Sequence, residues 1–101
     1  MSAAALPAEM RVARVYAWGD VRVENDAVPA PAPGEIVVRI TACGLCGSDA
    51  LDWYVNRKAP VVLGHEPVGI VVSAGDGVTE PRVGARVFVH HHAPCMRCDE
   101  C

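Results

Sequence analysis

The sequence predicts a small, mostly β protein, arranged as a barrel or sandwich with one short helix. Runs of β-branched residues recur along the 101 residues, and each run has the length of a strand rather than of a core helix. Nine glycines and eight prolines lie mostly between these runs, where they favour turns. Many short strands separated by such turns are typical of barrels and sandwiches.

The first two elements are expected to form a hairpin. Residues 10–18 and 21–23 alternate apolar and polar side chains, and Gly19 and Asp20 between them favour a tight turn. Residues 26–34 carry three prolines and predict an extended connector.

A strand and a short helix are expected next. Residues 35–42 are rich in β-branched side chains and predict a strand, which Gly44 and Gly47 then end. Residues 48–55 predict the helix, because Ser48 can cap its first turn.

The last predicted elements are short strands. Residues 61–63 form an apolar run, residues 69–74 predict a strand, and residues 75–77 predict the turn that closes it. Residues 86–89 predict a further strand, which leads into the histidine triplet at 90–92.

Charge and hydrophobic patterning exclude several classes of function. Nine basic and twelve acidic residues give a net charge of −3, so the chain lacks the basic surface of a nucleic-acid-binding protein. No apolar run is long enough to span a membrane. The N-terminus lacks the pattern of a secretory signal, so we expect a cytoplasmic protein.

The five cysteines point to metal binding. An odd number in an unsecreted chain fits a disulfide framework poorly. Cys95, Cys98 and Cys101 place a thiol at every third position, a spacing that lets one loop direct several sulfurs at one ion. The fourth ligand is open: Cys43, a histidine of residues 90–92, or a cysteine further along the chain. An iron–sulfur site and a redox dithiol are the rival interpretations.

A second set of potential ligands lies in the middle of the sequence. Cys46 follows a predicted strand and opens the predicted helix, while His65 and Glu66 precede another strand. A thiolate, an imidazole and a carboxylate form a plausible catalytic zinc site, because such sites use three protein ligands and leave one position open. Gly64 permits close backbone approach, and Gly69 fits a tight entry to the following strand.

Three segments together resemble the zinc-dependent medium-chain alcohol dehydrogenase family. Residues 64–69, Gly-His-Glu-Pro-Val-Gly, are similar to its zinc signature, and residues 42–49 to the segment carrying its first catalytic zinc ligand. The cysteines at 95, 98 and 101 resemble the first three of its structural-zinc lobe. The resemblance extends from about residue 11 to residue 101 and is strongest to the sorbitol and threonine dehydrogenase branch.

The resemblance implies a fold and an activity. Residues 1–101 would form a GroES-like β-barrel catalytic domain, incomplete and N-terminal in a longer enzyme. That enzyme would oxidise a primary or secondary alcohol or polyol with transfer of hydride to NAD or NADP. No Gly-x-Gly-x-x-Gly follows a strand here, so the nicotinamide cofactor is expected only with a missing dinucleotide-binding domain. We expect this chain alone to be inactive and the full-length protein to be a homo-oligomer.

The resemblance also implies roles for individual residues. Cys46 and His65 would bind the catalytic zinc, and Glu66 would be a direct, water-mediated or switching ligand. Ser48 would hydrogen-bond the substrate hydroxyl and start the path of its proton to solvent. Asp49 would orient His65. Cys95, Cys98 and Cys101 would hold the structural zinc.

The sequence departs from the family at particular positions. Many members carry a proton-relay histidine where this chain has Leu51, and Asp52 next to it is expected to be a solvated helix residue. The fourth structural cysteine is not among the 101 residues. Neighbouring side chains of an extended segment point to opposite faces, so His90, His91 and His92 are not expected to meet at one ion, although one can line the active-site cleft.

Two other functions remain open from the sequence. The chain can be a non-catalytic zinc-binding module with a GroES-like fold, or a truncated product that acts through a partner. Alternatively, Cys98 and Cys101 can serve a thiol redox protein.

Overall fold

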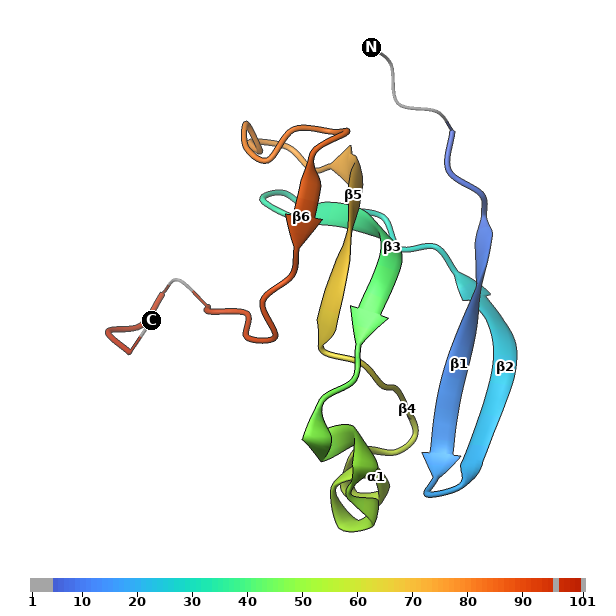
Figure 1. The fold of residues 1–101 in the computed structure, drawn as a ribbon. Helices are drawn as coiled ribbons and strands as arrows, with labels where there is room; N and C mark the ends of the chain where they lie inside the picture. Colours follow the sequence, from blue (N-terminus) through green and yellow to red (C-terminus); the bar gives the residue numbers. More distant parts are fainter. Residues whose placement is uncertain (1–4, 96, 101) are drawn as a thin grey trace.

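The computed structural model describes residues 5–95 and 97–100, and its strands form two three-stranded antiparallel sheets (Figure 1). One sheet has the strand order β2-β1-β4 and the other β3-β5-β6. The elements are β1 (Glu9–Ala17), β2 (Asp20–Ala27), β3 (Ile36–Gly44), the 3-10 helix η1 (Gly47–Ala50), α1 (Asp52–Lys58), β4 (Val61–Val62), β5 (Glu66–Ala74) and β6 (Arg86–Phe88). The predicted mostly β class is therefore confirmed.

The predicted hairpin is present as β1 and β2. The strand β2 continues to Ala27, beyond the predicted residues 21–23, and the turn lies at Trp18 and Gly19, where Gly19 has a φ of +84°. The guanidinium of Arg14 donates to the carboxylates of Glu24 and Asp26, each at 2.7 Å. These cross-strand ion pairs tie β2 to β1 along the part that the sequence pattern missed.

The second sheet depends on a close approach between β3 and β5. The two strands pair from Ile36 opposite Ala74 to Gly44 opposite Glu66. A β-carbon added at Gly69 would lie 2.1 Å from the carbonyl oxygen of Arg39, which no real side chain tolerates. Glycine at this position therefore permits the strands to pair in this register.

The predicted helix is two helices rather than one. Leu51 has an extended conformation, with φ −99° and ψ 115°, and it separates η1 from α1. The predicted capping role of Ser48 is wrong, because Ser48 lies inside η1 and Cys46 takes the N-cap position. The carboxylate of Asp49 folds back and accepts from the backbone N–H of Cys46 at 3.1 Å, so an acid stabilises the first turn in place of Ser48. Neither helix of the described residues is long and apolar enough to cross a membrane.

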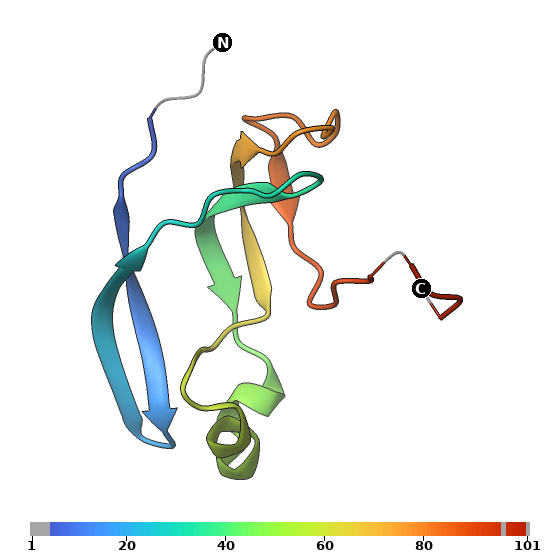
Figure 2. The ribbon, with the colours of Figure 1, turned by 180° about the vertical axis from the view of Figure 1, so that it is seen from behind.

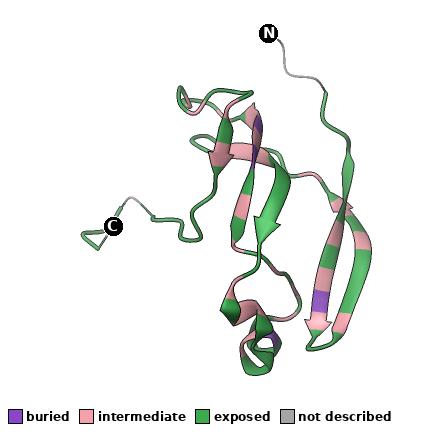
Figure 3. Cartoon of the chain, viewed as in Figure 1, coloured by how far each residue is buried: buried purple, intermediate pink, exposed green. Residues whose placement is uncertain are grey.

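The two sheets do not close into the expected barrel within the described residues (Figure 2). Their facing sides leave an apolar groove of about 620 Å³, whose lining includes Val12, Val38, Ile40 and Val62. The buried apolar side chains among the described residues are few, and they lie far apart in the chain (Figure 3). They are Val15, Val55 and Val71.

The close approach at Gly69 gives a test of the fold. We expect Gly69→Ala to lower the free energy of unfolding by about 1–3 kcal/mol, because the added methyl group forces β3 and β5 apart. Urea unfolding followed by circular dichroism measures the change. Gly47→Ala is the matched control, since its β-carbon would have no atom within 4 Å. Equal stability of the two variants would contradict the steric explanation.

Candidate metal centre

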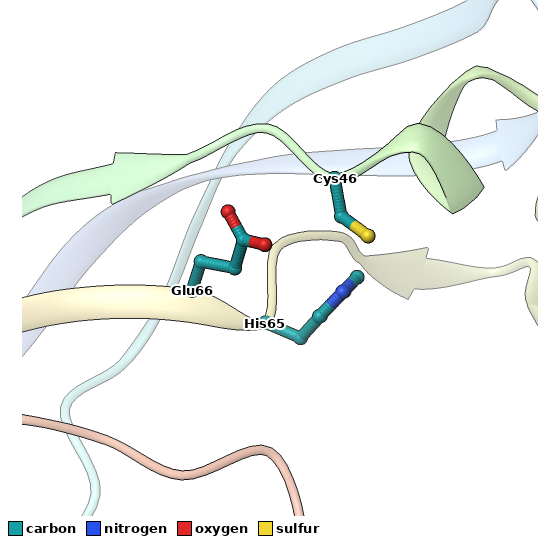
Figure 4. Close-up of side chains that lie close together, drawn as sticks. All are labelled: Cys46, His65 and Glu66. Atoms are coloured by element: carbon teal, nitrogen blue, oxygen red, sulfur yellow. The ribbon is translucent and has the colours of Figure 1, made fainter.

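Three side chains with metal-binding atoms converge where β3, η1 and β5 meet (Figure 4). Cys46 precedes η1, His65 lies in the loop between β4 and β5, and Glu66 is the first residue of β5. One ligand atom of each residue lies within 4.8 Å of the others. Cys46 and His65 are half-buried, whereas Glu66 is exposed, so the group is open to solvent on one side.

Glycines make the room in which these side chains meet. Gly44 pairs with Glu66 across the sheet, and a β-carbon on Gly44 would lie 2.6 Å from the Oε2 atom of Glu66. The bare backbone of Gly44 is therefore the surface over which the Glu66 carboxylate lies. Gly64 turns the chain before His65 with a φ of +115°, a conformation that side-chain-bearing residues rarely adopt.

Asp49 connects two of the three potential ligands. Its Oδ2 atom accepts from the backbone N–H of Cys46, while its Oδ1 atom lies 3.8 Å from Nδ1 of His65. Oδ1 is buried and has no hydrogen-bond partner among the described residues. A buried carboxylate oxygen without a donor is costly, and a small shift of the His65 ring would supply one. A proton held on Nδ1 of His65 leaves the Nε2 lone pair for an ion.

The surroundings of Cys46 favour ionisation of its thiol. Its pKa lies below the ordinary value for cysteine, chiefly because the backbone N–H of Ser48 donates to the sulfur, and further because of the Ser48 hydroxyl and the His65 imidazole. A thiolate, rather than a thiol, is the form that binds a metal ion. Donor chemistry and convergence together fit a zinc ion with three protein ligands.

The C-terminal cysteines form a separate, exposed group. Sγ of Cys95 and Sγ of Cys98 lie 3.3 Å apart, and the backbone N–H of Arg97 donates to Cys95 at 3.4 Å. The segment extends away from both sheets (Figure 1). Cys101, the third predicted ligand, lies outside the described residues. The predicted structural zinc site therefore remains a prediction.

The histidine triplet departs from its expected geometry. The prediction that the rings of His90, His91 and His92 point to opposite faces is wrong, because the chain leaves β6 and bends at His91. The ring of His91 lies 5.8 Å from that of His65. The pKa of His91 is lowered, first by the charge of His92, then by desolvation and by His90 and His65. Two residues of the triplet, His90 and His91, line the cleft beside the candidate centre, where the sequence analysis expected one.

Three further residues that the sequence analysis discussed lie outside the converging group. Cys43, a possible fourth ligand of the C-terminal cysteines, is exposed, and it does not belong to the group of converging ligands described above. Leu51 is 42% exposed and joins the two helices. Asp52 is exposed and accepts from the backbone N–H of Trp53 at 2.7 Å, as expected of a solvated helix residue.

Two features of the centre were missed in the sequence analysis, and one of them has a recognisable signal in the sequence. The clearance that Gly44 gives to Glu66 follows from strand register, which the pattern does not specify. The bond from the Cys46 N–H to Asp49 has a local signal, an acid three residues after the N-cap position, which is the spacing of a capping box.

Comparison with known proteins identifies similar chains. The family model described as the alcohol dehydrogenase GroES-like domain matches residues 32–101. Human sorbitol dehydrogenase is 39% identical over 100 residues, covering 93% of this chain and 28% of that protein. The L-threonine 3-dehydrogenase of Thermococcus kodakarensis is 38% identical over 91 residues, covering 84% of this chain and 26% of that protein. The chain thus spans about a quarter of the length of these curated relatives.

A solved structure shares the fold. A protein from Sinorhizobium meliloti 1021, described as a zinc-binding dehydrogenase bound to NADP, matches with a TM-score of 0.77 and 36% sequence identity. The match covers 94% of this chain and 28% of the other. The open pair of sheets seen here is therefore similar to the corresponding quarter of a larger protein.

The lowered pKa of Cys46 gives a test of the local electrostatics. In the metal-free protein, we expect Ser48→Ala to raise the pKa of Cys46, because the variant removes the hydroxyl donor to the sulfur. Less thiolate is then present at neutral pH, so Cys46 reacts more slowly with iodoacetamide and its rate profile moves to higher pH. Peptide mass spectrometry measures the rate at Cys46 alone. Ser73→Ala in β5 is the control, and an unchanged profile in Ser48→Ala would contradict the assignment.

Proposed function

The chain belongs to the family of alcohol dehydrogenase GroES-like domains, and we propose that it is the N-terminal part of the catalytic domain of a zinc-dependent dehydrogenase. The enzyme oxidises an alcohol or polyol to the carbonyl compound, with transfer of hydride to NAD or NADP and release of one proton. The observation that carries the proposal is the convergence of Cys46, His65 and Glu66, with ligand atoms within 4.8 Å of one another.

In this proposal Cys46, His65 and Glu66 hold the catalytic zinc. The ion, when bound, acts as a Lewis acid that stabilises the alkoxide form of the substrate. The lowered pKa of the Cys46 thiol supports its role, because a sulfur that ionises more readily binds an ion at a smaller protonation cost. Solvent exposure on the Glu66 side supports an open position for the substrate.

Two neighbouring residues position the reacting groups. Ser48 lies beside the sulfur of Cys46, and its hydroxyl accepts the substrate proton and passes it towards solvent. Asp49 fixes the backbone at Cys46 and faces Nδ1 of His65, so it orients both residues without touching the substrate. The exposed Leu51 offers no proton acceptor, so the proton continues through water.

Further parts of the enzyme lie elsewhere in a longer protein. The solved relative with NADP bound is several times longer than this chain, which supports a nicotinamide site formed by additional residues. We propose that Cys95, Cys98 and Cys101 bind a structural zinc, together with a fourth ligand. The 3.3 Å between the sulfurs of Cys95 and Cys98 supports a shared ion.

A cysteine exchange tests the proposed catalytic site. In the full-length protein, we expect Cys46→Ser to lose one zinc ion and to lower kcat for a polyol by about three orders of magnitude, because alkoxide stabilisation by the metal is lost. Elemental analysis counts the zinc, and NAD(P)H absorbance follows the reaction. Cys43 is an exposed thiol outside the converging group, so Cys43→Ser is the matched control. We expect this variant to keep both its zinc content and its activity. Full zinc and full activity in Cys46→Ser would refute the proposal.

A glycine exchange tests the part played by Glu66. We expect Gly44→Ala to displace the Glu66 carboxylate, since the new methyl group would lie 2.6 Å from its Oε2 atom. The obstacle is the end of a flexible side chain, so folding is little affected while zinc affinity falls. Competition with a chromophoric chelator measures the affinity, and thermal unfolding of the metal-free protein measures the stability. Unchanged zinc affinity would show that Glu66 is not a ligand in any form.

A further inference from the structure

The backbone of His92 fixes which nitrogen of the His90 ring carries the proton. The amide nitrogen of His92 lies 3.1 Å from Nδ1 of His90 and donates its proton to that nitrogen. The carbonyl oxygen of His92 is further from Nδ1, at 3.4 Å. An amide N–H can only donate, so Nδ1 is the acceptor and the proton of the neutral ring lies on Nε2. Nε2 of His90 is therefore an N–H donor.

This donor is held in place but has no protein partner in the described part of the chain. Nε2 of His90 makes no hydrogen bond to residues 5–95 or 97–100. The ring stacks on that of His91, with ring centres 4.8 Å apart and planes inclined by 25°. Stacking on one side and the bond from His92 on the other restrict the rotation of the ring. An oriented donor without a partner is suited to an oxygen atom of a ligand.

His90 shares a cleft with two of the potential metal ligands. The cleft has a volume of about 240 Å³, and the polar residues that line it are His65, Glu66, His90 and His91. The ring of His91 contacts both neighbouring rings, at 5.8 Å for His65 and 4.8 Å for His90. A substrate with one oxygen at the candidate metal centre can therefore extend past His91 and present a second oxygen to His90.

The remaining walls of the cleft favour a neutral substrate. They are apolar and consist of Pro67, Val68, Phe88 and Val89. Phe88 is 78% exposed and pairs with Val68 across β5 and β6, so the two side chains offer a surface for a carbon chain. No lysine or arginine of the described residues lines the cleft. A carboxylate on the substrate would meet the Glu66 carboxylate there without a cation to offset the repulsion.

We propose that His90 determines the substrate class of this enzyme, a role that rests on the dehydrogenase function proposed above. Its Nε2–H donates to a second hydroxyl of a neutral polyol, while the reacting hydroxyl lies at the candidate metal centre. A hydroxyl oxygen accepts such a bond without adding charge to the cleft. An alcohol with a single hydroxyl displaces water from Nε2 and leaves this donor unpaired, which lowers its affinity.

Three six-carbon alcohols test the proposal on the full-length, zinc-loaded protein, with NAD and NADP both supplied. We expect the wild type to oxidise the hexitol D-sorbitol with a higher kcat/KM than hexan-2-ol or 5-hydroxyhexanoate. His90→Phe keeps an aromatic ring and removes the donor. We expect it to lower kcat/KM for the hexitol about tenfold, mainly by raising KM, and to change that for hexan-2-ol by less than about twofold. NAD(P)H absorbance follows the reaction, and circular dichroism checks the fold.

The same exchange at the next histidine but one is the matched control. His92 does not line the cleft, and His92→Phe keeps the backbone N–H that orients His90. We expect this variant to retain the wild-type kcat/KM for the hexitol and for hexan-2-ol.

The possible failures are distinguishable. Equal losses for the hexitol and hexan-2-ol in His90→Phe, or no loss for either, would overturn the role of His90. A wild-type preference for hexan-2-ol or 5-hydroxyhexanoate would overturn the assignment of a polyol. Oxidation of none of the three alcohols by the wild type would count against the dehydrogenase function itself, and the proposal for His90 would fall with it.

Discussion

The register in which β5 pairs with β3 is the constraint on which the candidate metal centre depends. Gly69 can meet the carbonyl of Arg39 only because it has no side chain, and this contact fixes the two strands against each other. The same register sets Gly44 opposite Glu66 and brings the start of β5 beside the turn that carries Cys46. A shift by one residue would move Glu66 to the other face of the sheet. Two glycines in paired strands therefore determine where the ligands meet.

The sequence was sufficient to predict the class of fold and the identity of the three converging residues. Strand positions came from β-branched runs. Cys46, His65 and Glu66 came from their donor chemistry together with the resemblance of residues 42–49 and 64–69 to a known family of dehydrogenases. The prediction of a single helix was wrong, because apolar periodicity does not reveal one extended residue such as Leu51 between two helical turns. The histidine rings were misjudged because the alternation rule applies to strands, and β6 ends at Phe88 before the triplet begins. Local rules predicted local structure, whereas strand register and loop bends depend on distant contacts.

The open pair of sheets accounts for the small core. A sheet of three strands buries residues well only where another layer covers it, and here the facing sides leave an apolar groove between them. The buried side chains lie at central positions: Val15 in β1 between β2 and β4, Val71 in β5 between β3 and β6, and Val55 in α1, which contacts β1. The candidate metal centre lies at the end of β3 and the start of β5, where η1 follows β3.

Asp49 can couple the positions of two of the potential metal ligands, in addition to its charge. One carboxylate holds the backbone of Cys46 through Oδ2 and faces the ring of His65 through Oδ1, although these residues are far apart in the sequence. Once a small shift of the His65 ring brings Nδ1 within hydrogen-bond distance of Oδ1, the one carboxylate would tie both groups to η1, and their separation would vary less than the position of either. An ion between them would then meet a nearly constant distance between its sulfur and nitrogen ligands, even while the surrounding loop fluctuates.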